Sequence, residues 1–150
     1  MAYRHTSAML QEVMTCLACR PGGIYVDCTL GGAGHAHAIC EQILPDGLLI
    51  GIDQDPDAIA NAQVSLKPYT ADIRLFHGNF VHLPEYLTQL HVGAVHGILL
   101  DLGLSQHQIE ASGRGFTFQK DEPLDTRMDT RNPNRAQDLI ADFSEDQLAQ

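Results

Sequence analysis

The stretch IYVDCTLGGAGHAHAI, residues 24 to 39, joins an apolar, β-branched run to a cluster of small residues and then to a helical pattern. Glycine occupies three of the four positions from 31 to 34, with Ala33 between them. Glycine lets the chain turn sharply and lets a ligand lie against bare backbone at the start of a helix. This order of strand, loop and helix predicts a ligand site on a parallel sheet.

The alternation of strand and helix continues along the chain. Besides the strand at 24–28, apolar runs predict strands over 48–53, 72–80 and 95–105, the last including its exit loop. Helical spacing of apolar residues, with Pro and Gly breaks between the segments, predicts helices over 7–19, 35–44, 55–66, 82–90 and 134–143. Such alternation favours right-handed βαβ units. We therefore expect an α/β fold with a doubly wound parallel sheet.

The length of 150 residues suits one domain with its own core. The apolar fraction is 44%, and no run approaches the roughly 18 apolar residues that a membrane helix needs. The first residues lack the basic start and apolar stretch of a secretory signal. We therefore expect a soluble, cytoplasmic protein without membrane contacts.

The four cysteines are expected to be free thiols in a reducing compartment. Cys16 and Cys19 form a C-x-x-C, and His35, His37 and Cys40 follow, so a zinc site is an alternative. A structural zinc site usually has two closely spaced ligand pairs, and the sequence has one. We expect small buried side chains here and no metal.

The net charge of −10 argues against a general nucleic-acid binder. The positive charges are nevertheless concentrated, because five of the nine Lys and Arg residues lie between positions 114 and 135. This segment is a candidate for contacts with phosphates or for closing over a site. The alternative is a solvated loop of mixed charge, which is equally plausible for any single arginine.

Ligands of parallel sheets bind beyond the carboxyl ends of the strands. Asp53 ends the second predicted strand 22 positions after Gly31, where a carboxylate suits the hydroxyls of a ribose. Asn79 and Phe80 follow the third strand and suit the edge and face of an adenine, although Phe80 is equally suited to the core. Asp101 follows the fourth strand and is expected opposite the glycines. The predicted ligand therefore contains a nucleoside.

The class of nucleoside can be narrowed further. A dinucleotide site needs G-x-G-x-x-G or its Ala variant, and alignment on Gly32 and Gly34 puts His37 where a small residue belongs. The P-loop pattern is not found in the sequence either. A nicotinamide oxidoreductase is therefore disfavoured. S-adenosylmethionine fits better, because it has no pyrophosphate and carries a sulfonium cation that suits carboxylates.

The pattern changes after the fourth strand. Residues 1–102 are predicted to form a Rossmann-like cofactor-binding core, and residues 103–150 a loop-rich segment that leads into a helical insertion. Residues 144–147, SEDQ, have the Ser-x-x-Gln form of a capping box and so predict another helix start. We therefore expect the sheet to be incomplete in this chain and later strands to lie outside it.

Six segments carry a resemblance to a known family. HTSAMLQEV (5–13), GGIYVDCTLGGAGH (22–35), GIDQDPDAIANA (51–62), HGNF (77–80), GILLDLGLS (97–105) and RGFTFQKDEPLDTRMD (114–129) are similar to the ribosomal RNA small-subunit methyltransferase H family, also called MraW. The last segment is the most diagnostic. The resemblance extends from about His5 to the end of the chain.

The resemblance implies a class I methyltransferase that uses S-adenosylmethionine. It implies methylation of the exocyclic N4 of a cytidine in 16S ribosomal RNA of the small subunit. It also implies cofactor contacts at Ala33, Gly34, His35, Asp53, Phe80, Asp101 and Gln108. His35 and Gln108 come from the resemblance alone. A histidine after a glycine turn is otherwise more often a hydrogen-bonding group at a helix start.

The sequence departs from the family pattern at several places. The family usually has Ser-Ser-Pro-Gln after the fourth strand, whereas Ser105 is followed here by Gln-His-Gln. Thr126 stands where methionine is usual, and Ala33 where glycine is usual. Members of the family are also much longer, and their second half supplies later strands and a helical subdomain.

No catalytic residue follows from the sequence. Cytosine N4 is a weak nucleophile, so it must be held in line with the methyl group and offered an acceptor for a proton. The Asp/Asn-Pro-Pro-Tyr loop of many aminomethylases is missing from the sequence, and neither Asp101 nor Ser105 is assigned that role. The alternative function is a truncated, non-catalytic fragment that at most binds the cofactor, with an exposed edge of the fourth strand favouring self-association.

Overall fold

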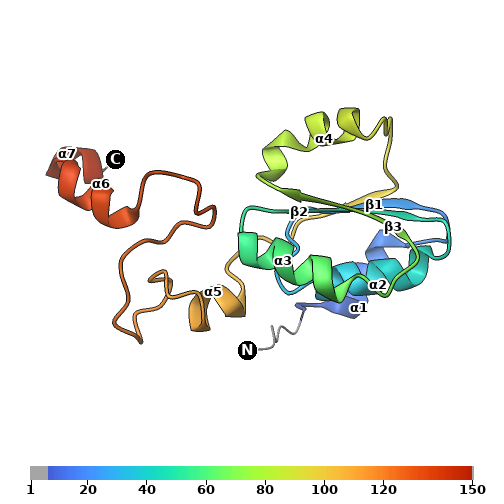
Figure 1. Ribbon diagram of the computed structural model, residues 1–150, viewed down its shortest axis with the longest axis horizontal. Helices are drawn as coiled ribbons and strands as arrows, with labels where there is room; N and C mark the ends of the chain where they lie inside the picture. The colour runs from blue at the N-terminus through green and yellow to red at the C-terminus, as the bar shows by residue number, and fades with distance from the viewer. Residues whose placement is uncertain (1–6, 150) are drawn as a thin grey trace. The chain divides into compact units, whose positions relative to one another are not determined.

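The computed structural model describes residues 7–149, which divide into two compact units, one up to Gly103 and one from Leu104. In the described residues the first unit contains a four-stranded parallel sheet with helices on both faces (Figure 1). The strands are β1 (Ile24–Asp27), β2 (Leu48–Asp53), β3 (Asp72–His77) and β4 (Gly97–Leu99). The predicted doubly wound parallel sheet is confirmed.

The strand order β3-β2-β1-β4 determines where a ligand can bind. The chain builds the sheet outward from β1 through β2 to β3, and then crosses back so that β4 pairs with the other side of β1. The order of the strands therefore reverses between β1 and β4. Such a reversal opens a crevice at the carboxyl ends of the strands, and ligands of open α/β sheets bind there.

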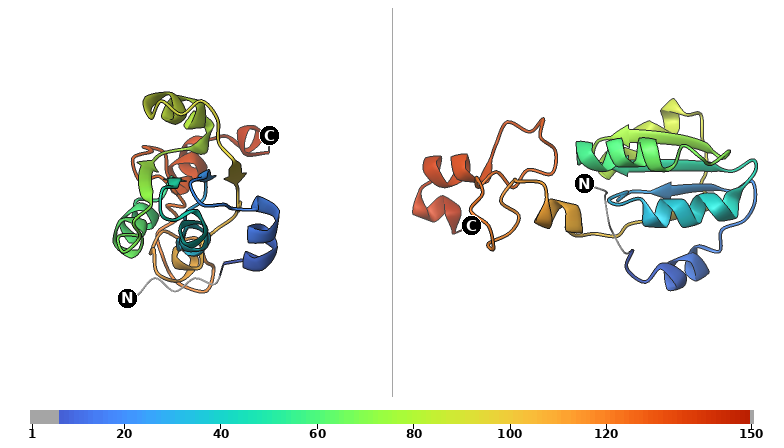
Figure 2. Two further views of the ribbon diagram at one scale, coloured as in Figure 1. Left: turned by 90° about the vertical axis from the view of Figure 1, so that its right-hand side faces the viewer. Right: turned by 60° about the horizontal axis from the view of Figure 1, so that its bottom comes forward.

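Three helices cover one face of the sheet, as the views in Figures 1 and 2 agree. They are α1 (Leu10–Leu17), α2 (Gly34–Ile43) and α3 (Pro56–Ser65). Ile39 and Ile43 of α2 pack with Tyr25 and Leu49 of the sheet in a fully buried cluster. Burial of each such side chain stabilises the fold by about 1.5–3 kcal/mol.

The opposite face is covered by the short helix η1 (Phe80–His82) and by α4 (Leu83–Gln89). Val26, Ile50 and Ile52 are fully buried under these two elements. The ring of Phe76 stacks on that of Tyr86 in α4, with centroids 4.3 Å apart. Both faces of the central strands are thus apolar, which explains their nearly continuous hydrophobic sequence.

β3 is shorter than the sequence predicts. The strand expected over 72–80 ends at His77, because Asn79 caps η1 by accepting a hydrogen bond from Val81 N at 2.9 Å. The segment 95–105, predicted to hold a strand and its exit loop, contains β4, which pairs with β1.

The second unit contains α5 (Gln106–Glu110), α6 (Ala136–Asp142) and α7 (Glu145–Leu148). The sequence predicts a loop where α5 lies. Ser105 N donates to Gln108 Oε1 at 2.9 Å, and Gln108 N donates to Ser105 Oγ at 3.2 Å, which forms a capping box. Residues 105–108 therefore carry the same Ser-x-x-Gln signal as 144–147. Among residues 7–149, no helix is both long and apolar enough to cross a bilayer.

Candidate functional site

The glycine loop between β1 and α2 is held in a conformation that favours small residues. Gly31 has φ 45° and Ala33 has φ 63°, both in the left-handed region. Gly34 begins α2, and a Cβ at this position would collide with the side chain of Ser7. Glycine is needed at position 31 for the turn and at position 34 for space, whereas Ala33 accepts a strained φ.

Asp53 joins the end of β2 to this loop. Its Oδ2 accepts a hydrogen bond from Gly31 N at 2.8 Å, and its Oδ1 accepts one from Asp55 N at 2.9 Å. Burial raises the pKa of Asp53, and these backbone hydrogen bonds oppose the rise. A carboxylate has about four acceptor positions, so Asp53 can accept further bonds from ribose hydroxyls.

Asp101, which follows β4, lies beside His35 of α2, near the place where the strand order reverses. Asp101 N donates to Thr29 Oγ1 at 2.8 Å, which ties the exit loop of β4 to the glycine loop. The Asp101 carboxylate lies 3.8 Å from His35 Nδ1, and His35 Nε2 lies 3.0 Å from Ala8 O. A carbonyl oxygen only accepts, so Nε2 carries the hydrogen. His35 thus anchors α2 to the segment before α1.

The side chains after β3 are engaged within the protein. Asn79 Oδ1 caps η1, and Asn79 Nδ2 donates to Gln54 Oε1 at 3.1 Å. Phe80 is half-buried and packs against the cluster around Val26 and Ile52. The expectation that Phe80 covers an adenine ring stays a prediction.

Gln108 belongs to the second unit. Its side chain is buried, and its Oε1 accepts from Ser105 N in the capping box of α5. The cofactor contact that the resemblance implies for Gln108 stays a prediction.

Asp27, at the end of β1, was missed by the sequence analysis. It is completely buried, its Oδ1 accepts from Thr29 N at 3.0 Å, and its Oδ2 has no hydrogen-bond partner within residues 7–149. Burial raises the pKa of Asp27 to about 7, with added repulsion from Asp53 and Asp101, while the bond from Thr29 opposes the rise. The sequence did offer a signal for this residue, because an acid at the end of an apolar strand, shortly before the glycines, is unusual.

These features together fit a small cationic nucleoside. The glycine loop offers bare backbone at the start of α2, and Asp53 offers free acceptor positions. Asp27, Asp53 and Asp101 place three carboxyl groups near one another at the strand ends, and one of them has an unpartnered oxygen. Within the described residues no group of three or more His, Cys, Asp and Glu side chains is arranged to hold a metal.

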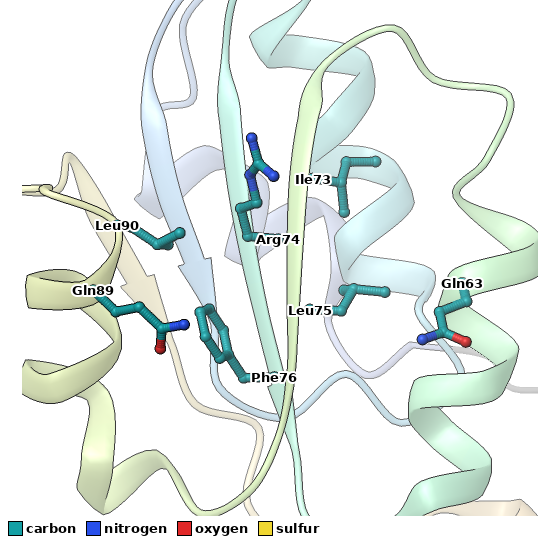
Figure 3. A pocket seen from close by; sticks show the side chains of 7 residues that line it. All are labelled: Gln63, Ile73, Arg74, Leu75, Phe76, Gln89 and Leu90. Atoms are coloured by element: carbon teal, nitrogen blue, oxygen red, sulfur yellow. The ribbon is translucent and has the colours of Figure 1, made fainter.

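A separate hollow lies along β3, between α3 and α4 (Figure 3). None of the predicted site residues lines it. In Figure 3 the side chains of successive β3 residues point to opposite sides of the strand, towards Gln63 on one side and Gln89 and Leu90 on the other. The hollow is therefore separate from the ligand site expected at the carboxyl ends of the strands.

The arginines between positions 114 and 135 bond within their own segment. Arg114 is buried and donates to the carbonyl oxygens of Arg127 and Met128 at 2.9 and 3.0 Å. Arg127 forms a bidentate ion pair with Asp125, in which Nε donates to Oδ1 and Nη2 donates to Oδ2, both at 2.7 Å. Arg131 pairs in the same manner with Asp129. These contacts hold the loop together, so the loop is ordered by its charged residues.

Comparison with known proteins supplies the family. The chain is 51% identical over 148 residues to ribosomal RNA small subunit methyltransferase H of Desulfosudis oleivorans, covering 99% of this chain and 47% of the relative. It is 50% identical to the protein of the same name from Geotalea uraniireducens over 147 residues, with 98% and 47% covered. The chain thus spans about half the length of these relatives.

A solved structure supports the fold. The C-terminal domain of precorrin-6Y C5,15-methyltransferase from Rhodobacter capsulatus superposes with a TM-score of 0.51 at 22% identity, covering 71% of this chain and 56% of that one. The model of the MraW methylase family matches residues 2–150. The glycine loop, the acids at the strand ends and this match agree, and the chain belongs to the MraW methylase family.

Proposed function

We propose that this chain carries the cofactor-binding part of a cytoplasmic, S-adenosylmethionine-dependent methyltransferase that acts on N4 of a cytidine in 16S ribosomal RNA. The names of its relatives support the rRNA part of this proposal. The observation that supports the cofactor part is the 2.8 Å hydrogen bond from Gly31 N to Asp53. It joins the glycine loop to a carboxylate that is suited to bind the hydroxyls of a ribose.

S-adenosylmethionine supplies a methyl group bound to a positively charged sulfur. The residues of this chain bind and orient it: Asp53 accepts from the sugar hydroxyls, and the backbone of the glycine loop lies against the tail. The acids at the strand ends favour a cation at the crevice. Holding the amino nitrogen in line with the methyl group lowers the barrier by several kcal/mol.

In this proposal residues 1–102 are the cofactor-binding core, and residues 103–150 are a loop-rich segment leading into a helical insertion. Cofactor contacts at Ala33, Gly34, His35, Phe80, Asp101 and Gln108 belong to the same proposal. The target cytidine has to be unstacked or already single-stranded to reach the site. No residue is assigned as the acceptor of the amino proton.

Calorimetry tests the cofactor site. We expect the purified chain to bind S-adenosylmethionine, and we expect Asp53→Asn to weaken binding by about tenfold or more, because each lost ribose hydrogen bond is worth about 1 kcal/mol or more. Asp46→Asn is the matched control, because Asp46 is exposed in the turn before β2, at the other end of that strand. A folded chain that does not bind S-adenosylmethionine would overturn the proposal.

Transfer of a labelled methyl group to unmethylated small ribosomal subunits tests the activity. Label found on N4 of a cytidine in 16S rRNA supports the proposal, and label on another atom overturns its finer part. The second candidate function is a non-catalytic module that binds the cofactor without transfer. It is favoured by the position of β4 at the edge of the sheet formed by the described residues, which also favours self-association.

A further inference from the structure

Asp27 is a buried acid, and no positive group among the described residues is paired with it to stabilise a negative charge. Its side chain is completely buried, and within residues 7–149 it has no ion pair and no hydrogen bond to Oδ2. An ionised carboxylate in such a position is costly unless a positive charge is brought near it. This side chain is therefore expected to hold a proton until a cation arrives.

The titratable groups named around Asp27 lie at the ends of β1 and β2, after β4 and on α2. Asp53 lies at the end of β2, and Asp101 follows β4, and both raise the pKa of Asp27 by repulsion. Cys28 follows on the same strand, and burial raises its pKa to about 11, so it stays neutral. His35 of α2 lies next to Asp101. The immediate surroundings of Asp27 are therefore acidic.

We propose that Asp27 is a positioning residue that gives up a proton when the positive charge of S-adenosylmethionine occupies the strand ends, so that cofactor binding is proton-linked. This inference rests on the proposed function. Asp27 is completely buried, so it acts on the ligand through its charge and not by direct contact. Thr29 links it to the exit of β4, because Thr29 N donates to Asp27 Oδ1 and Thr29 Oγ1 accepts from Asp101 N.

The direction of the linkage follows from the free state. With a pKa of about 7, Asp27 is mostly protonated at pH 6, and ligand binding has to release that proton. Below pH 7 the affinity is expected to rise about tenfold for each unit of pH, and above pH 7 it levels off. In the bound state the ionised carboxylate of Asp27 attracts the cation and still accepts the hydrogen bond from Thr29 N.

Calorimetry with S-adenosylmethionine between pH 5.5 and 8, in buffers that differ in ionisation enthalpy, measures this linkage. We expect release of about one proton at pH 6 and almost none at pH 8. Asp27→Asn should bind with an affinity that no longer changes with pH, whereas Asp46→Asn should keep the slope. His35→Gln is the second variant, because His35 lies beside Asp101. A slope that is lost in His35→Gln and kept in Asp27→Asn would overturn the assignment to Asp27.

Two further ligands identify the charge that is sensed. S-adenosylhomocysteine keeps the ammonium group but has no sulfonium, and methylthioadenosine has neither. If the affinity depends on pH for S-adenosylmethionine alone, the linkage belongs to the sulfonium. If it depends on pH for both S-adenosylmethionine and S-adenosylhomocysteine, the linkage belongs to the ammonium group. An equal slope with methylthioadenosine would overturn the inference, since that ligand brings no positive charge.

A measurement on the free chain keeps this test separate from the proposed function. The carboxyl carbon of Asp27, followed by NMR with carbon-13 labelling, should titrate near pH 7 without ligand and shift to lower pH when the ligand is bound. A chain that binds S-adenosylmethionine with the same affinity at every pH overturns the proton linkage and leaves the proposed function standing. A folded chain without any affinity overturns the proposed function, and with it the linkage.

Discussion

Asp27 and Asp53 show how two acids at the ends of neighbouring strands acquire different properties. Asp53 is partly exposed, and hydrogen bonds from two backbone N–H groups oppose the rise in its pKa that burial causes. Asp27 is completely buried, and Thr29 N donates a hydrogen bond to its Oδ1. The same residue type therefore serves as a ligand-facing acceptor at one strand and as a buried proton carrier at the next.

The buried state of Asp27 predicts an unusual dependence of stability on pH. The folded pKa of about 7 lies above the ordinary value of 3.8, so the folded chain binds the proton more tightly than the unfolded chain does. The contribution of Asp27 to stability is therefore greatest at low pH and falls as pH rises from about 4 to about 7. Asp27→Asn should abolish this fall. Between pH 5 and pH 8 the free energy of unfolding of the variant should therefore gain about 1–4 kcal/mol on that of the wild type.

Urea unfolding at pH 5 and pH 8 measures this difference. Asp46→Asn serves as the control and should follow the wild type at both pH values. If the Asp27→Asn and wild-type curves stay parallel across this range, Asp27 is ionised in the folded chain and the interpretation of its burial is wrong.

At the scale of elements, β4 is the edge strand of the sheet that the described residues form. It pairs with β1 on one side and is the last strand in the order β3-β2-β1-β4. Ile98 in β4 is 44% exposed, and Leu100 directly after it is 47% exposed. An open strand edge with apolar side chains is a site for pairing with another strand.

We expect the chain to self-associate through this edge as its concentration rises. Ile98→Lys should reduce the association, because a lysine on an edge strand resists pairing. Val64→Lys is the matched control, since Val64 is 75% exposed on α3 and lies on a different element. Sedimentation velocity over a range of concentrations measures the change. Equal association of both variants and the wild type would show that β4 is not the contact.

At the scale of the whole molecule, the two units are stabilised by different forces. Within the described residues every buried apolar side chain lies at or before Leu99, and the buried side chains beyond it are those of Gln108 and Arg114. The first unit is therefore held by its core, and the second by hydrogen bonds and ion pairs. Units of these two kinds differ in their local stability.

This difference predicts where a substitution at Arg114 acts. Arg114→Ala removes the bonds to the carbonyl oxygens of Arg127 and Met128, and buried carbonyl groups without a partner each destabilise by about 1–3 kcal/mol. Amide hydrogen exchange should accelerate in the second unit and stay unchanged in the sheet. Arg131→Ala removes an exposed pair and should have a small effect. Faster exchange in β1 and β2 as well would contradict this picture.

Much of the fold and part of the site follow from local patterns. The strands around Val26 and Ile50, the cap of Asp55 on α3 and the position of Asp53 depend on residues close together in the sequence. The five-residue helix α5 was missed although its capping box is local, because the surrounding Gly, Ser and Pro residues favoured a loop. The end of β3 was misplaced, because η1 competes with the strand for the residues after His77.

The sequence alone determined the parallel sheet, the small-residue turn and the family, because periodicity, loop composition and motif order are properties of neighbouring residues. The tertiary structure decided the environment of Asp27, which depends on groups that β2 and β4 bring to it from 26 and 74 positions away. Desolvation and repulsion act through space, so no local pattern of residues could specify the charge of this side chain.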